Sequence, residues 1–162
     1  PEVVRPKRQI IVNSSFEDIG NWTLTHASKA KYMAVDIETR AKQITCIGFA
    51  CSKDLALVIP FVDPANGKSY FETVEKECQA WSLVIWILSL PAKKIFQNGL
   101  YDLQFLLRMG IRPTNCHEDT MLLHHSLYPE LQKGLGFLGS IYTNEAAWKL
   151  MRQKGEELKA DE

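Results

Sequence analysis

The sequence predicts an α/β domain in which helices pack on a mixed sheet. Three neighbouring apolar runs rich in β-branched and aromatic residues predict strands, and a later change to three- and four-residue apolar spacing predicts helices. The chain has 162 residues, of which 46% are hydrophobic and 23% charged. This size and composition are typical of one soluble globular domain and exclude a disordered or collagen-like chain.

The first half of the chain predicts a strand meander. Residues 1–30 carry a basic lead and a polar stretch, which we expect to form a strand and short helical turns. The runs KYMAVDIET, ITCIGFACS and LALVIPFV follow, separated by polar turns, and predict three antiparallel strands. FVDPANGKS then supplies the Pro, Asn and Gly of a loop.

The second half predicts a helix, a strand and two further helices. An apolar stripe predicts an amphipathic helix that Pro91 ends, and its members are Val74, Cys78, Trp81, Val84, Ile85 and Leu88. KKIFQ predicts a short strand, and NGLYDLQFLLRMG a helix that Asn98 could cap and Gly110 could stop. DTMLLHHSLYPE predicts another helix with Asp119 as its N-cap.

Charge, cysteines and hydropathy narrow the class of protein. Lys plus Arg and Asp plus Glu both number 19, so no global charge indicates a nucleic-acid partner, although metal-holding carboxylates would offset basic residues. The four cysteines show no CxxC pair, which favours reduced thiols in a cytosolic setting. The start lacks a signal peptide, and the longest apolar stretch is about half of a membrane span.

Two carboxylates share one face of a predicted strand. Side chains alternate along KYMAVDIET, so Asp36 and Glu38 point the same way and Val35 and Ile37 the other. Like charges this close raise each other's pKa unless a cation neutralises them. A divalent metal is one interpretation, and a solvated strand end is the other.

A third carboxylate lies on the helix that follows KKIFQ. Asn98, Tyr101 and Asp102 fall at three- and four-residue spacing near one helical face. Asp102 could complete a cluster with Asp36 and Glu38 large enough for two Mg²⁺ ions, or it could lie on the wet flank of the helix.

The run HEDTMLLHHSLYPEL contains two adjacent histidines. His124 and His125 would lie on different faces of a helix, so we expect one on the surface and one packed. Asp119 is expected to cap this helix rather than to bind metal.

Together these motifs resemble the 3′ to 5′ exonuclease domain of family A DNA polymerases, in a phage-like form, within the DEDD exonuclease superfamily. AVDIET is similar to the first motif, FQNGLYDLQFL to the second, and EDTMLLHHSLYPELQKGLGFLGSIYTNE to the segment that leads to the third. The similarity covers about residues 31–148.

The resemblance implies a ribonuclease H-like fold and hydrolysis with two divalent metal ions, Mg²⁺ or Mn²⁺ in its place. By that resemblance Asp36, Glu38 and Asp102 would bind the catalytic metals, while Thr39, Asn98 and Tyr101 would contact the substrate. The partners it implies are the 3′ end of single-stranded DNA and a covalently attached polymerase domain, in the cytoplasm of a bacterial cell or phage-infected host.

The chain departs from the family pattern in its third motif. That motif places a Tyr four positions before a fourth metal-binding Asp, and no such pair occurs in this sequence. We therefore expect an exonuclease domain at 31–148 with residues 1–30 as its lead-in, a helical tail at 149–162, and the fourth ligand beyond Glu162.

Two other functions remain open. The chain could be a non-catalytic module that binds single-stranded DNA ends or braces a polymerase. It could also be an RNA 3′ exonuclease of the ribonuclease D kind, which shares the motifs.

Overall fold

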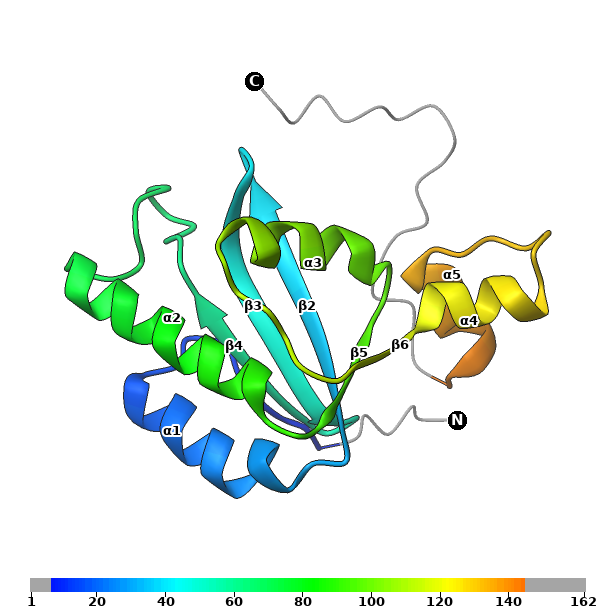
Figure 1. Cartoon of the computed structure of the whole chain (residues 1–162), viewed down its shortest axis with the longest axis horizontal. Coiled ribbons are helices and arrows are strands. Elements are labelled where there is room, and N and C mark those ends of the chain that lie inside the picture. Colours follow the sequence, from blue (N-terminus) through cyan, green and yellow to red (C-terminus); the bar gives the residue numbers. More distant parts are fainter. Residues whose placement is uncertain (1–6, 145–162) are drawn as a thin grey trace.

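The computed structural model describes residues 7–144, which form a six-stranded mixed sheet with helices against it (Figure 1). Its strands are β1 (Gln9–Ile11), β2 (Tyr32–Arg40), β3 (Gln43–Ser52), β4 (Leu55–Pro60), β5 (Lys93–Phe96) and β6 (Cys116–Asp119). Its helices are α1 (Phe16–Thr25), the 3₁₀ turn η1 (Ala27–Lys29), α2 (Val74–Ser89), α3 (Gly99–Arg108), α4 (Thr120–Leu127) and α5 (Leu135–Tyr142).

The strands lie in the order β1-β4-β3-β2-β5-β6. Strands β2, β3 and β4 pair antiparallel, which confirms the predicted meander. Strand β5 pairs with β2 in parallel, and β6 pairs with β5 in parallel. The carboxyl ends of β2, β5 and β6 therefore lie at the same end of the sheet. Figure 1 shows α1, α2 and α3 in front of the sheet and the pair α4 and α5 beside β6.

One hydrophobic core fills the space between the sheet and these three helices. It takes Met33, Val35 and Ile37 from β2 and Leu106 from α3, all at most 5% exposed. Burial of each large apolar side chain contributes about 1.5–3 kcal/mol. The other members include Ile19, Trp22, Ile47, Phe49, Leu57, Ile59, Val84, Ile87 and Leu88.

Helix α2 forms where the sequence predicted it, but the predicted stripe is wrong in part. The buried face is Ala80, Val84, Ile87 and Leu88, whereas Val74 is 74% exposed and Ile85 49% exposed. Cys78 is exposed as well, and Trp81 is half-buried. Because apolar residues surround most of this helix, spacing alone does not select the arc that meets the sheet.

Helix α3 has sharply defined ends. Gly110 has φ of 77° and donates its N–H to Leu107 O, while Ile111 N–H donates to Leu106 O, so the helix stops in a Schellman motif, as Gly110 predicted. At the other end a Cβ on Gly99 would lie 2.5 Å from Phe96 Cβ. Glycine therefore lets α3 start directly against the end of β5.

Two predicted regions differ from the observed elements. Helix α1 is a full helix rather than short turns, and it starts with a capping box in which Ser15 and Asp18 satisfy each other's backbone N–H groups. Strand β6 and helix α5 were not predicted as elements. The predicted tail at 149–162 lies outside the described residues.

Within residues 7–144, no helix has both the length and the apolar character needed to cross a bilayer.

Candidate active site

The carboxylates of β2 lie on the face opposite the core. Met33, Val35 and Ile37 are buried, and Asp36 and Glu38 between and beyond them are exposed. The alternation expected from the sequence is confirmed, and both acidic side chains occur near the carboxyl end of β2. Because both carboxylates stay exposed, neither loses its hydration when the chain folds.

Asp102 is instead buried, at 3% exposure, and it joins α3 to β2. Its Oδ1 accepts a hydrogen bond from Ile37 N at 2.9 Å. The pKa of Asp102 is raised to about 6, mainly by burial; the Ile37 N–H lowers it, and the charges of Asp36 and Asp119 add to the rise. The alternative that Asp102 lies on a wet flank is thus wrong, and its carboxyl group lies close enough to Asp36 for the charge of Asp36 to raise its pKa.

Thr39 and Tyr101 meet across the same junction. Thr39 Oγ1 lies 2.5 Å from Tyr101 Oη, which connects the end of β2 to the first turn of α3. The β2–β3 register shifts between Glu38 and Thr39, where Thr45 is left over on β3. Such a bulge changes the direction of the side chains that follow it. No residue pattern in the sequence predicts this bulge.

Asn98 occupies the N-cap position of α3 but does not cap it with its side chain. The residue has φ of 62° and ψ of 45°, a left-handed conformation that Asn tolerates, and its side chain makes no capping hydrogen bond. The predicted side-chain cap is therefore wrong. The Asn98 side chain is exposed next to the first turn of α3.

Asp119 supplies the cap that Asn98 does not. Its carboxylate caps α4 by accepting from Met121 N at 2.9 Å, as predicted, and from Leu122 N at 3.3 Å. The same carboxylate accepts from Asn98 N at 3.1 Å and Gly99 N at 2.6 Å. Sequence analysis missed this second role, which ties the starts of α3 and α4 together; only the pairing of β6 with β5 reveals it.

The two histidines divide as predicted. His124 is 2% exposed, and its Nδ1 lies 2.9 Å from Tyr142 Oη, so it connects α4 to α5. His125 is exposed. All four cysteines are free thiols.

The donor set has the chemistry of a hard divalent cation site. Asp36, Glu38 and Asp102 offer only carboxylate oxygens, the ligands that Mg²⁺ and Mn²⁺ prefer. Within the part of the chain that the structure describes, no three His, Cys, Asp or Glu side chains are gathered closely enough to hold a metal ion. The carboxylates are thus neighbours rather than an assembled cluster.

This arrangement brings carboxylates of β2 and α3 and two hydroxyl groups to the carboxyl end of β2. Asp36 and Asp102 repel each other, and a cation between them would relieve that repulsion. The neutral groups at this junction are the paired hydroxyls of Thr39 and Tyr101 and the exposed amide of Asn98 at the start of α3.

Several solved structures share this fold. The POL domain of Pol1 from M. smegmatis in complex with DNA primer-template and dNTP matches with a TM-score of 0.61 and 16% identity, over 83% of this chain and 22% of that one. Escherichia coli RNase D, an exoribonuclease involved in structured RNA processing, matches with a TM-score of 0.53 and 19% identity, over 83% of this chain and 33% of that one.

Brucella melitensis NrnC matches with a TM-score of 0.61 and 15% identity, over 94% of this chain and 70% of that one. NrnC structures with bound Mg²⁺ and with bound pGG match as well. At these identities the likeness shows the fold, which is the ribonuclease H-like fold of DEDD exonucleases. The chain spans only about a fifth of the polymerase structure and a third of RNase D.

The sequence profile of the 3′–5′ exonuclease domain matches residues 15–158, and the chain belongs to this family. A sequence search among curated proteins gives no significant match.

Proposed function

We propose that this chain removes nucleotides from the 3′ end of single-stranded DNA, as the proofreading domain of a DNA polymerase. The observation that carries the proposal is the position of Asp102, which is buried and hydrogen-bonded to the backbone of the strand that bears Asp36 and Glu38, within electrostatic reach of Asp36. A pKa of about 6 for a carboxyl group in a candidate site is typical of functional residues.

Asp36, Glu38 and Asp102 would hold two divalent metal ions. Bound there, the ions would supply a nucleophile from water and stabilise charge on the leaving 3′ oxygen. The Ile37 N–H orients the Asp102 carboxyl group, and Asp119 fixes the start of α3 that carries it. Asp119 is therefore a positioning residue in this proposal.

Neutral side chains would place the terminal nucleotide. Thr39 and Tyr101 hold each other by their hydroxyl groups, so they present a fixed edge to the substrate. The Asn98 side chain, free of a capping bond, is available to a phosphate oxygen. Fixed groups of this kind lower the entropic cost of aligning the scissile bond.

The fold is shared by enzymes that act on RNA, so a ribonuclease D-like activity is the second candidate. The likeness to E. coli RNase D, an exoribonuclease, supports RNA as the substrate, whereas the likeness to Pol1 in complex with DNA supports DNA. A direct comparison of substrates separates the two.

The test uses a DNA strand and an RNA strand of one sequence, each labelled at its 5′ end, incubated with Mg²⁺ or with EDTA. We expect the DNA to shorten stepwise from its 3′ end with Mg²⁺ alone, and Asp36→Ala to abolish shortening. Asp54→Ala, in the turn at the opposite end of β3, is the matched control. Faster shortening of RNA, or internal cuts, would contradict the proposal.

Metal binding is tested separately by titration calorimetry with Mn²⁺. Asp36→Ala is expected to weaken binding at least tenfold, since it removes one of three expected ligands. Unchanged binding in that variant would exclude the assignment of the site even if a nuclease activity were present.

A further inference from the structure

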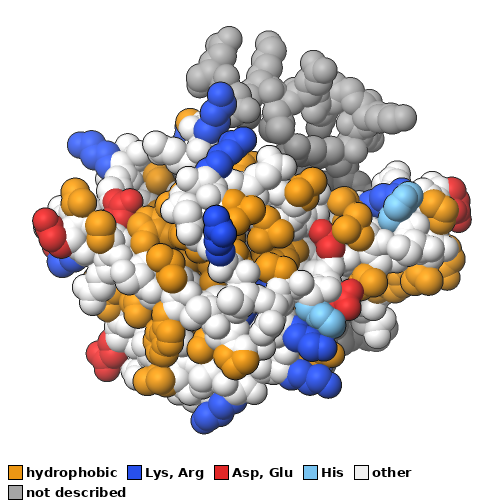
Figure 2. Space-filling view, viewed as in Figure 1, with side chains coloured by type: hydrophobic (Ala, Val, Ile, Leu, Met, Phe, Trp, Pro, Cys, Tyr) orange, Lys and Arg blue, Asp and Glu red, His pale blue; other side chains and the backbone are white. Residues whose placement is uncertain are grey.

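A group of basic side chains lies at the amino ends of β2 and β5, at the opposite end of β2 from the candidate active site. Tyr32 and Lys93 stand opposite each other in the β2–β5 pair, and His117 lies on β6, which pairs with β5. Lys31 directly precedes β2. Figure 2 shows side chains of the Lys and Arg class beside a histidine, below α4 and α5. We call Lys31, Tyr32, Lys93 and His117 the basic cluster.

The side chains of the basic cluster converge on the ring of Tyr32. Lys31 Nζ lies 5.3 Å from the centroid of this ring, and Lys93 Nζ lies 5.9 Å from it. The ring of His117 lies 6.5 Å from the ring of Tyr32, and Lys93 Nζ lies 3.2 Å from His117 Nε2. An ammonium group over an aromatic ring is weakly attracted to it. Tyr32 therefore holds two cations near each other.

The two lysines of the basic cluster form no ion pair within residues 7–144. Glu118 contacts the histidine instead, with its Oε1 3.3 Å from His117 Nε2. In any one tautomer, His117 Nε2 either accepts a hydrogen bond from Lys93 or donates one to Glu118. Neither arrangement brings a carboxylate to Lys31 or Lys93, so both ammonium charges stay uncompensated.

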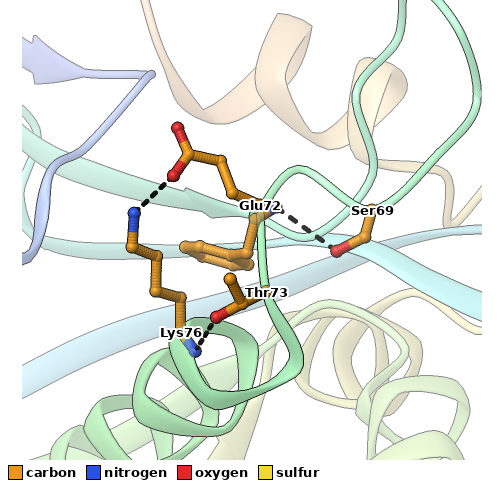
Figure 3. Close-up of polar contacts among 5 residues, drawn as sticks. Ser69, Glu72, Thr73 and Lys76 are labelled. Atoms are coloured by element: carbon orange, nitrogen blue, oxygen red, sulfur yellow. Dashed lines mark hydrogen bonds and ion pairs between the residues drawn. The ribbon is translucent and has the colours of Figure 1, made fainter.

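Lys76 shows how another exposed lysine of this chain is neutralised. Its Nζ pairs with Glu72 Oε2 at 2.6 Å, close to the start of α2 (Figure 3). In the basic cluster, by contrast, ammonium groups gather without a carboxylate, and their repulsion costs free energy. An anion bound between them would relieve that repulsion.

The shape of the basic cluster favours a phosphate on a large ligand over a free one. Lys31, Tyr32 and His117 are exposed, and Lys93 is half-buried. Sites for small molecules are usually concave, whereas this cluster lies open at the end of the sheet. A nucleic-acid duplex presents closely spaced phosphates on its outer surface, and ammonium, imidazole and phenol groups can all donate to phosphate oxygens.

The basic cluster is also well separated from the candidate active site. Tyr32 precedes Asp36 by four residues and Glu38 by six on the same strand. At about 3.3 Å per residue, the cluster lies about 13–20 Å from these carboxylates. A nucleic acid bound at the cluster is therefore held by different residues from those that hold a strand end at the metal site.

We propose that the basic cluster docks the phosphate backbone of a nucleic-acid duplex, apart from the candidate active site. Lys31 and Lys93 each neutralise a backbone phosphate, and the His117 ring is a further donor to phosphate. Contacts to backbone phosphates carry no sequence information, so the site takes duplexes of any sequence. The proposal goes beyond the exonuclease function and does not depend on the metal-binding carboxylates.

Glutamine substitutions separate charge from folding at this site. Lys31→Gln combined with Lys93→Gln removes both ammonium groups and keeps the backbone bond in which Lys93 N donates to Lys31 O at 3.0 Å. Lys93→Arg keeps the charge. Lys76→Gln is the matched control, because it removes one exposed lysine charge elsewhere on the surface. Thermal unfolding of each variant shows whether it is folded before binding is measured.

The test measures fluorescence anisotropy of a labelled DNA duplex of about 20 base pairs in EDTA, so that no cleavage occurs. The double glutamine variant is expected to bind about tenfold more weakly, equally for two unrelated duplex sequences. Its slope of log affinity against log salt should fall by about 2, or about 0.9 for each lost phosphate contact. Lys93→Arg and Lys76→Gln should stay within about twofold of the original chain.

Equal affinity of the double glutamine variant and the original chain would overturn the proposal. Competition by dTMP as strong as that by unlabelled duplex, at equal phosphate concentration, would overturn it and indicate a free nucleotide. Equally strong competition by poly-glutamate would overturn it and indicate an acidic protein. No binding of the duplex by the original chain would overturn it too, whereas Mg²⁺-dependent shortening of single-stranded DNA would still support the exonuclease function.

Discussion

Asp102 illustrates how one residue can oppose stability and serve a site. The fold buries its carboxyl group at 3% exposure, and the backbone N–H of Ile37 compensates for this in part. Because its folded pKa, about 6, lies above its ordinary value of 3.8, the unfolded chain holds the ionised form more favourably. Its contribution to stability therefore falls as pH rises from about 4 to about 6, and stays low above that range.

Asp102→Asn should consequently stabilise the metal-free protein near neutral pH. The amide oxygen can still accept from Ile37 N, and the buried charge is gone. We expect a gain of about 1–3 kcal/mol above pH 6 that disappears near pH 4, measured by urea unfolding across this range. Asp54→Asn is the control, and a gain that does not vary with pH would contradict the assigned cause.

Asp119→Ala should destabilise two helices at once. Four backbone N–H groups lose their acceptor, those of Asn98, Gly99, Met121 and Leu122. At about 1 kcal/mol or more for each helix cap, we expect a loss of about 2–4 kcal/mol in the free energy of unfolding. Glu118→Ala tests the neighbouring position, and an equal loss there would show that the effect is not capping.

Residue patterns in the sequence placed Asp36 and Glu38 on one face of β2, because strand alternation is a strict geometric rule. The same patterns gave Asn98 the wrong role. Capping depends on which acceptor lies nearest, and Asp119 reaches the start of α3 only because β6 pairs with β5. A partner that arrives from about twenty positions away cannot be found from local spacing.

Helices and strands with strong local signals were predicted well. The meander, β5, and α3 with its Gly110 stop all formed as expected. Strand β6 was missed because its four residues, CHED, show neither apolar alternation nor β-branched side chains. Its pairing with β5 is decided by the sheet edge rather than by its own composition.

The junction of β5 and α3 makes a prediction at the level of elements. Gly99→Ala would place a Cβ 2.5 Å from Phe96 Cβ and 2.7 Å from Phe96 Cγ, so α3 must shift. We expect a loss of about 1–3 kcal/mol in stability and weaker Mn²⁺ binding, because Asp102 moves with the helix.

Gly20→Ala is the matched control, since a Cβ at this position in α1 meets nothing within 4 Å. It should raise stability by about 0.5–1 kcal/mol, as is usual for Gly replaced by Ala within a helix. The contrast is measured by thermal unfolding and titration calorimetry of both variants. Equal effects of the two changes would show that the contact with Phe96 does not matter.

For the molecule as a whole, metal binding should stabilise the folded state. A cation that binds only the folded state at about 100 times its Kd adds about 2.7 kcal/mol, which for this size raises Tm by about 5–10 °C. We expect Mg²⁺ to raise Tm and EDTA to reverse the change, with a smaller shift below about pH 6 because Asp102 is then protonated. A full shift in Asp36→Ala would contradict the assigned ligands.

The α/β class and the mixed sheet could be predicted from the sequence, because the spacing of apolar residues changes where strands give way to helices. The groove among the β2–β3 turn, the β4–α2 loop and α3 could not be predicted from the sequence. Its lining comes from separate segments between Lys42 and Met109 that meet only in the folded chain. The fourth ligand expected beyond Glu162 stays a prediction.

The shared cap at Asp119 has a consequence for how the molecule opens. Its carboxylate accepts from backbone N–H groups at the start of α3, which precedes β6, and at the start of α4, which follows β6. We therefore expect fraying of α4 to loosen the first turn of α3 as well. The amides of Asn98, Gly99 and Met121 should then exchange with deuterium at one common rate, in a single cooperative unit.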